Sequence, residues 1–199
     1  GKVFYKDERA RFSLGSFKAL GGAYAVLRQV RSAGRPAGEN VVTCATDGNH
    51  GRSVAWGAKR FGCRCVIYIH ETVSKGRADA IAAYGAEVRR VPGTYDDAVR
   101  QAAADAAANG WIVVSDTSYP GYVDIPRDVM QGYAIMADEA LSQMGDPPTH
   151  VFLQAGVGGL AAAVCGHLWE TLGERRPRTV VVEPDRAACL FESARTGKA

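Results

Sequence analysis

Three short stretches of this sequence carry residues whose types and spacing suit chemistry on a small charged molecule. The first is Ser13-Leu14-Gly15-Ser16-Phe17-Lys18, where Ser16 suits a helix N-cap and Lys18 falls in the first helical turn. The positive end of a helix disfavours an ammonium, and an uncharged amine is what a lysine needs to bond to a carbonyl carbon. A plain surface lysine on an amphipathic helix is the alternative for Lys18.

The second stretch is Thr46-Asp47-Gly48-Asn49-His50-Gly51, which follows an apolar strand pattern and opens a helix pattern. In open α/β sheets, ligands bind at the carboxyl ends of strands. Asn49 could donate a hydrogen bond to a phenolate oxygen. Asp-Gly is also a generic turn signal, so a binding loop and a simple turn both remain open here.

The third stretch is Gln154-Ala155-Gly156-Val157-Gly158-Gly159-Leu160, again between a strand pattern and a helix pattern. Successive backbone N–H groups at a helix N-terminus form a cradle for an anion such as a phosphate. Residues 156–161 also fit the dinucleotide fingerprint G-x-G-x-x-A, with Glu183 at the end of a later strand. The loop alone therefore does not distinguish a cofactor phosphate from a dinucleotide pyrophosphate.

The elements that must position these stretches alternate between helix and strand, which indicates an α/β fold with mostly parallel sheets flanked by helices. Helices are predicted over 16–30, 49–61, 75–84, 95–108, 128–144 and 160–172. Strands are predicted over 40–45, 63–69, 87–91, 111–115, 149–155 and 178–183. We expect two domains: a larger one of 1–30 with 126–199, and a smaller inserted one of 31–125. The Pro- and Gly-rich segment 120–126 is the predicted crossing point.

Composition narrows the class of protein. The 199 residues are 47% hydrophobic and 23% charged, and the net charge of +3 comes without a basic stripe, so nucleic acid is not an expected partner. No apolar run approaches the roughly 20 residues of a membrane helix, and we expect no signal peptide. The five cysteines form no C-x-x-C pair and the histidines no metal-like cluster, so we expect no metal site and a cytoplasmic setting.

Together and in this order, the three stretches resemble the tryptophan synthase β family of pyridoxal-5'-phosphate (PLP) enzymes, which have fold type II and include threonine and serine dehydratases. The resemblance implies that Lys18 bonds covalently to PLP and that Asn49 holds its phenolic oxygen. It implies that the phosphate rests on the amides of Gly156, Val157, Gly158, Gly159 and Leu160. It also implies a PLP-binding larger domain that continues past residue 199, a homodimer and an amino-acid substrate.

Two features are unlike the dehydratases. Asp47 stands where they carry a small hydroxyl residue, and the stretch 115–122, followed by Ile125-Pro126 and 130–133, also differs. Both resemble the diaminopropionate ammonia-lyases, which convert either enantiomer of 2,3-diaminopropionate to pyruvate and two ammonia molecules. A carboxylate would stabilise the cationic β-amine of that substrate better than a hydroxyl.

Turnover of both enantiomers requires a base on each face of the substrate. Our hypothesis assigns one face to Lys18 and the other to Asp47, while Asp116 holds the β-ammonium or shares the proton transfer. The structural alternatives are a turn former for Asp47 and a cap for Asp116.

The expected function is therefore PLP-dependent α,β-elimination of diaminopropionate. The nearest alternative is a serine or threonine dehydratase. An NAD-dependent oxidoreductase would rest on the glycine loop alone, and a chain that folds but holds cofactor poorly is a further alternative.

Overall fold

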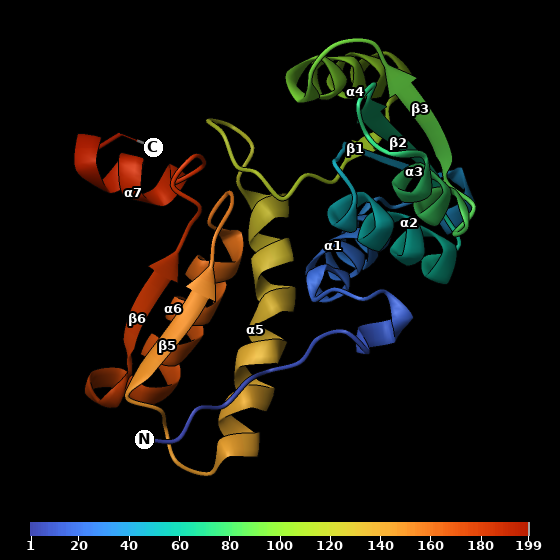
Figure 1. Cartoon of the computed structure of the whole chain (residues 1–199). Helices are drawn as coiled ribbons and strands as arrows, with labels where there is room; N and C mark the ends of the chain where they lie inside the picture. Colours follow the sequence, from blue (N-terminus) through green and yellow to red (C-terminus); the bar gives the residue numbers. More distant parts are fainter. Residues whose placement is uncertain (199) are drawn as a thin grey trace. The chain divides into compact units, whose positions relative to one another are not determined.

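Strands and helices alternate along the whole chain, as the sequence predicts (Figure 1). The structure is a computed structural model that describes residues 1–198. Its contacts divide the chain into two compact units. We call Asp7–Gly132 the lysine unit, and Gly1–Lys6 with Tyr133–Ala199 the glycine-loop unit.

A four-stranded parallel sheet forms the centre of the lysine unit, with its strands in the order β3-β2-β1-β4. Its strands are β1 (Val41–Ala45), β2 (Arg64–His70), β3 (Glu87–Val91) and β4 (Ile112–Val113). Its helices are α1 (Lys18–Ser32), α2 (Asn49–Phe61), α3 (Lys75–Ala82) and α4 (Tyr95–Asn109), with 3-10 turns at Arg11–Ser13 and Ala37–Glu39. Because all four strands run the same way, their carboxyl ends meet at one edge of the sheet.

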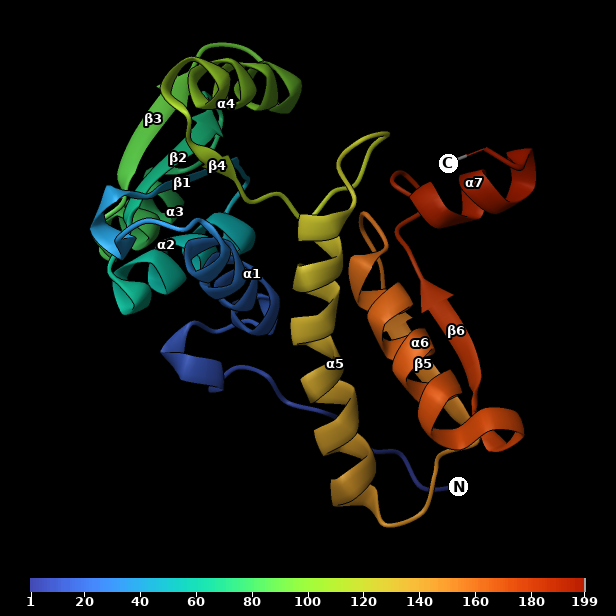
Figure 2. The ribbon, with the colours of Figure 1, turned by 180° about the vertical axis from the view of Figure 1, so that it is seen from behind.

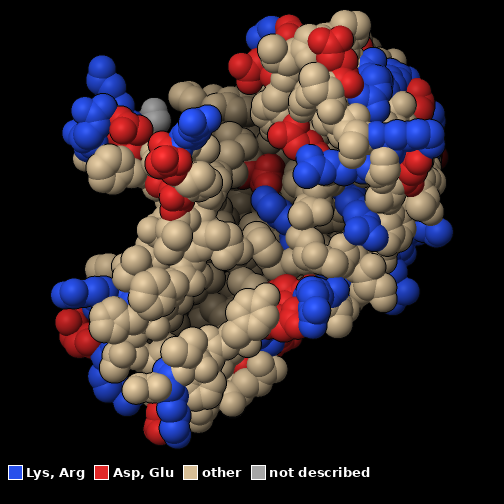
Figure 3. Space-filling view, in the orientation of Figure 1, with Lys and Arg blue, Asp and Glu red and all other residues tan. Residues whose placement is uncertain are grey.

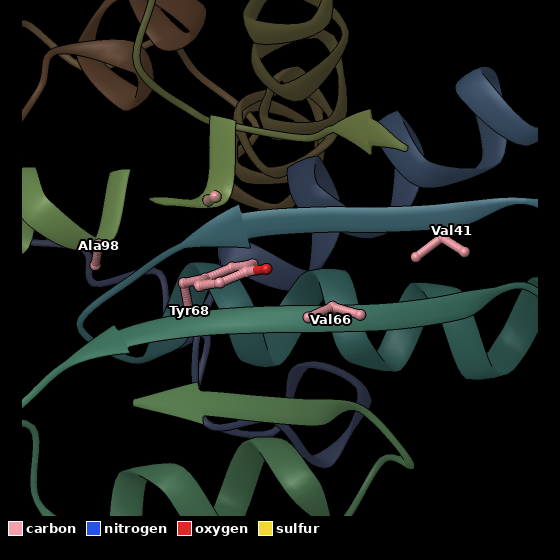
Figure 4. Close-up of a cluster of buried hydrophobic side chains, with 5 residues drawn as sticks. Val41, Val66, Tyr68 and Ala98 are labelled. Carbon is pink, nitrogen blue, oxygen red and sulfur yellow. The ribbon is translucent and has the colours of Figure 1, made fainter. Parts of the chain in front are cut away.

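Helices cover both faces of this sheet, which explains why its central strands are apolar along their length. Val41, Val66 and Tyr68 pack against α4 on one face (Figure 4). On the other face, Gly51 of α2 lies against Ile67 of β2. Figures 1 and 2 show α4 on one side of the strands and α1 and α2 on the other.

Glycines let α1 pack closely against two other helices, α2 and α5. Helix α5 (Asp124–Met144) begins in the lysine unit. A Cβ added to Gly132 of α5 would lie 2.1 Å from the carbonyl oxygen of Leu20. A Cβ added to Gly22 would lie 2.1 Å from Ser53 Oγ of α2. Because Lys18 is the first residue of α1, these contacts fix where the lysine lies.

Two elements differ in length from the sequence expectation. The strand predicted over 111–115 is assigned only to Ile112–Val113, which pair with Val42 and Thr43 of β1. The Tyr122 hydroxyl bonds the backbone at Val113 and Ser115. Helix α5 begins at Asp124 rather than at Asp128. Pro126 is accommodated in its first turn, where no backbone N–H is needed.

The glycine-loop unit contains two parallel strands joined through a helix. Its elements are β5 (His150–Gln154), α6 (Gly159–Leu172), a 3-10 turn at Gly173–Arg175, β6 (Arg178–Val182) and α7 (Cys189–Thr196). Helix α6 packs against β5, and both views show β5 and β6 side by side (Figures 1 and 2). The loop 155–158 therefore joins the carboxyl end of a strand to the amino end of a helix.

These elements confirm the predicted α/β class with parallel strands and flanking helices. The domain boundaries predicted from the sequence stay a prediction. Within residues 1–198, none of the helices is both long and apolar enough to cross a membrane. Basic and acidic side chains are interspersed over the face drawn in Figure 3.

Candidate active site

Lys18 lies at the amino end of α1 and forms an ion pair with a carboxylate from a distant part of the chain. The hydroxyl of Ser16 accepts a hydrogen bond from the backbone N–H of Lys18 at 3.2 Å. Ser53 of α2 donates to the Lys18 carbonyl oxygen at 2.8 Å. The Lys18 ammonium, Nζ, lies 2.5 Å from Oδ2 of Asp116. The lysine is thus held at both its backbone and its side chain.

Asp116 is placed by the segment that follows β4. The Tyr122 hydroxyl donates to the carbonyl oxygen of Val113 and accepts from the N–H of Ser115, each at 2.9 Å. The Tyr119 ring stacks on that of Tyr122 with centroids 4.9 Å apart. These contacts give Tyr122 a packing role in this turn. It holds the backbone from which Asp116 projects.

His50 is the third member of this cluster. It is the second residue of α2 and is 5% exposed. Its Nε2 lies 2.8 Å from the carbonyl oxygen of Val114, and its Nδ1 lies 3.7 Å from Asp116 Oδ2. Burial alone would raise the pKa of the Asp116 carboxyl, but attraction to His50 and Lys18 outweighs it and lowers that pKa. Asp116 therefore stays ionised beside Lys18 and His50.

Asp47 lies in the loop between β1 and α2, and its side chain is 61% exposed. Its Oδ1 lies 2.9 Å from Nε2 of His70, which follows the neighbouring strand. The Thr46 hydroxyl accepts from the N–H groups of Gly48 and Gly51 at 3.0 and 3.1 Å and closes the loop. His70 was not singled out by sequence reasoning, because its contact with Asp47 depends on β1 and β2 being neighbours.

The two glycines of this loop have structural reasons of their own. Gly48 has φ 157° and ψ −85°, a conformation that favours glycine. A Cβ added to Gly51 would lie 2.3 Å from Cγ2 of Thr46. Between them, Asn49 begins α2 and is exposed. The loop therefore presents Asp47 and Asn49 on a backbone that few other sequences could adopt.

Tyr95 is a further residue of this region that sequence reasoning missed. It begins α4 at the same edge of the sheet. Burial, followed by the negative charge of Asp116 and smaller effects that include Asp47, raises its pKa to about 12. Tyr95 therefore lies within electrostatic reach of both carboxylates as a protonated phenol. The sequence signal that could have identified Tyr95 is its position directly after the loop between β3 and α4.

The glycine loop of the second unit has the geometry of an anion cradle. Gly158 is the N-cap of α6 with φ 88°, and no side chain of the described residues caps that helix end. A Cβ added to Gly156 would meet nothing within 4 Å. Val157 is exposed, whereas Leu160 is buried, so only the backbone of Leu160 is available to a ligand. The first N–H groups of a helix lack partners within it and suit a phosphate.

Glu183, the residue that would complete a dinucleotide fingerprint, has another task in the structure. Its carboxylate accepts hydrogen bonds from the N–H groups of Leu190 and Phe191 at 3.0 and 2.9 Å. These bonds cap the start of α7. The Glu183 carboxylate oxygens that a ribose hydroxyl would require are therefore already engaged.

The structure brings together Lys18 and Asp116, and it places Asp47 and Asn49 on a neighbouring loop at the same edge of the sheet. The described residues contain no group of three or more side chains suited to a metal ion. The residues present fit PLP on their chemistry: a half-buried lysine amine, an Asn at a strand end and an uncapped glycine-rich helix start.

A family model and individual relatives of known function place this chain in the same family. The family model described as pyridoxal-phosphate dependent enzyme matches residues 1–199. Diaminopropionate ammonia-lyase of Escherichia coli K12 is 42% identical over 213 residues, covering 98% of this chain and 54% of the relative. A biosynthetic L-threonine dehydratase of Bacillus subtilis is 30% identical over 185 residues, covering 92% of this chain and 41% of that one. The chain thus spans about half the length of these curated relatives.

A solved structure agrees with these relatives. The crystal structure of holo diaminopropionate ammonia lyase from Escherichia coli is similar with a TM-score of 0.91 and 40% identity. The match covers 97% of this chain and 54% of that one. This similarity confirms the expected type II fold.

Proposed function

Because this chain belongs to the family of pyridoxal-phosphate-dependent enzymes, we propose that it acts as a lyase on 2,3-diaminopropionate. The reaction consumes one molecule of substrate and one of water and yields pyruvate and two of ammonia. The observation that carries the proposal is the presence of two carboxylates, Asp47 and Asp116, at the edge of the sheet where Lys18 lies. A substrate with a second, cationic amine requires such negative charge.

The three side chains have separate tasks in this proposal. Lys18 holds the cofactor and, once released, removes or returns the Cα proton on one face of the substrate. Asp47 serves the opposite face, since it is exposed and oriented by His70. Asp116 is kept ionised and accepts a hydrogen bond from the β-ammonium, which keeps a proton on the departing amine.

The residues that would hold the cofactor are those that the family resemblance implies. Lys18 would bond to it covalently, Asn49 would donate to its phenolic oxygen, and the amides of 156–160 would bind its phosphate. When bound, PLP supplies the electron sink that makes the Cα–H bond acidic.

A product assay tests the proposed reaction. Purified protein with PLP is offered D- and L-2,3-diaminopropionate, L-serine and L-threonine in parallel, and pyruvate or 2-oxobutyrate and ammonia are quantified. We expect two ammonia per pyruvate from both diaminopropionate enantiomers, with much slower reaction of the hydroxy amino acids. Preference for L-serine or L-threonine would instead identify a dehydratase.

We also propose a cytoplasmic homodimer. The five cysteines are all free in the structure, which suits a reducing compartment. The dimer follows from resemblance to the family, and light scattering of the purified protein measures it directly.

A further inference from the structure

The buried imidazole of His50 on α2 lies beside the Lys18–Asp116 ion pair, and the reaction proposed above assigns no role to it. Its Nε2 lies 2.8 Å from the Val114 carbonyl oxygen. A carbonyl oxygen only accepts, so Nε2 carries a proton. The other ring nitrogen, Nδ1, is buried and has no hydrogen-bond partner among the described residues.

That nitrogen points toward the carboxylate which Lys18 contacts. Nδ1 of His50 and Nζ of Lys18 lie 3.7 and 2.5 Å from the same oxygen, Oδ2 of Asp116. A neutral Nδ1 presents a lone pair to this negative oxygen, whereas a protonated Nδ1 presents a positive N–H. The arrangement therefore favours a proton on Nδ1 whenever Lys18 no longer supplies the positive charge.

Lys18 must become neutral before it can bond to the cofactor aldehyde. We propose that His50 is a positioning residue that receives, through Asp116, the proton that Lys18 loses. The ammonium of Lys18 gives one proton to the Asp116 carboxylate, and Asp116 in turn gives one proton to Nδ1 of His50. The products are a neutral amine, an unchanged carboxylate and an imidazolium, so the number of protons and the net charge of the cluster are conserved.

The other titratable groups around the cluster do not compete for this proton. Burial raises the pKa of Cys44 on β1, of Tyr95 on α4 and of Tyr122 after β4, and the nearby negative charge of Asp116 adds to each. All three stay protonated at neutral pH. None of these three side chains therefore offers an acceptor for the proton that Lys18 loses.

The matched test compares His50→Gln with His150→Gln. A glutamine amide can retain the hydrogen bond to the Val114 carbonyl oxygen but offers no proton acceptor at the place of Nδ1, while His150 is exposed on β5. Cofactor-free protein is mixed with PLP, and the rate of covalent capture by Lys18 is followed by visible absorbance from pH 6 to 9.

We expect capture by His50→Gln to be at least tenfold slower near neutrality, because positioned proton acceptors contribute about 100-fold or more. Its pH profile should also move to higher pH, while His150→Gln retains the original profile. An unchanged profile in a folded His50→Gln protein would overturn the proposal.

A second measurement does not depend on that variant folding. Nitrogen-15 NMR of His50 should show Nε2 protonated throughout, and Nδ1 gaining its proton on PLP binding. Asp116→Asn should reduce the fraction protonated on Nδ1. A His50 ring that carries the same protons with and without PLP would contradict the proposal. The proposal rests on the proposed function only in assigning Lys18 to the cofactor, so failure of the diaminopropionate assay would leave these tests intact.

Discussion

Each of the two carboxylates at the site has a histidine of its own. Asp116 is enclosed by Lys18 and the buried His50, whereas Asp47 is exposed and contacts His70. The enclosed carboxylate is held ionised by its attraction to His50 and Lys18, which makes it a good partner for a cation. The exposed one is free of that constraint. This difference in surroundings supports our proposal of Asp47 as a base and Asp116 as an ammonium partner.

Replacing Asp47 with asparagine tests this assignment. Asp47→Asn keeps an oxygen for the His70 hydrogen bond but cannot take up a proton. We expect kcat/KM for one enantiomer of diaminopropionate to fall about 100-fold or more, while the other enantiomer is affected far less. Asp79→Asn, which removes an exposed carboxylate of α3 that pairs with Lys75, serves as the control. Equal losses for both enantiomers would refute a separate base on each face.

The sequence predicted individual residues of the site better than their contacts. Lys18 at a helix start and Asp47 at a strand end follow from N-cap and loop signals close to them in the chain. The pair Lys18–Asp116 joins residues 98 apart, and His50 reaches Val114 across 64. Such contacts depend on β4 lying next to β1, and local patterns carry no information on strand order.

Close helix contacts, rather than large side chains, position α1. Gly22 allows α2 to approach, and Gly132 allows α5 to approach, each at a distance that excludes a Cβ. The obstacle at Gly132 is the backbone carbonyl of Leu20, which cannot turn aside as a side chain can. The position of Lys18 therefore depends on a glycine 114 residues away in the sequence (132 − 18).

The same substitution at two helical glycines tests this dependence. Gly132→Ala should lower the free energy of unfolding by about 1–3 kcal/mol, because the added methyl overlaps backbone. Gly166 in α6 has nothing within 4 Å of an added Cβ, and Gly166→Ala should raise it by up to about 1 kcal/mol. Chemical denaturation measures both. Equal effects of the two substitutions would show that the α1–α5 contact does not restrict position 132.

At the level of elements, the 3.6-residue and apolar patterns predicted most helices and strands. Helix α2 runs from Asn49 to Phe61, as predicted, and Gly62 after it has the left-handed conformation. The differences are in the lengths of elements: β4 is shorter than predicted and α5 begins four residues earlier. The Tyr122 hydroxyl bonds the backbone at Val113 and Ser115, and no periodicity in the sequence reveals this contact.

The whole molecule divides its chemistry between two units. The lysine unit carries the amine and both carboxylates, and the glycine-loop unit carries the uncapped start of α6. The sequence predicted both parts from signals at helix starts and strand ends. We propose that the loop 156–160 binds the phosphate of PLP.

Gly156→Ala tests the role of the loop without disturbing the fold. Its added methyl meets nothing within 4 Å in the cofactor-free protein, so the unfolding midpoint should not fall. A methyl in the space of a bound phosphate should weaken PLP binding by about tenfold or more, equivalent to about 1.4 kcal/mol. Equilibrium titration with PLP measures the affinity, and Gly166→Ala should leave it unchanged. Unaltered PLP affinity in Gly156→Ala would place the phosphate elsewhere.

The most direct test of the central claim is chemical. The protein is incubated with PLP, reduced with borohydride, digested and analysed by mass spectrometry for lysines that carry a pyridoxyl group. We expect the group on Lys18 and its loss in Lys18→Ala. A pyridoxyl group on another lysine, or on none, would contradict the assignment of Lys18 as the residue that holds the cofactor.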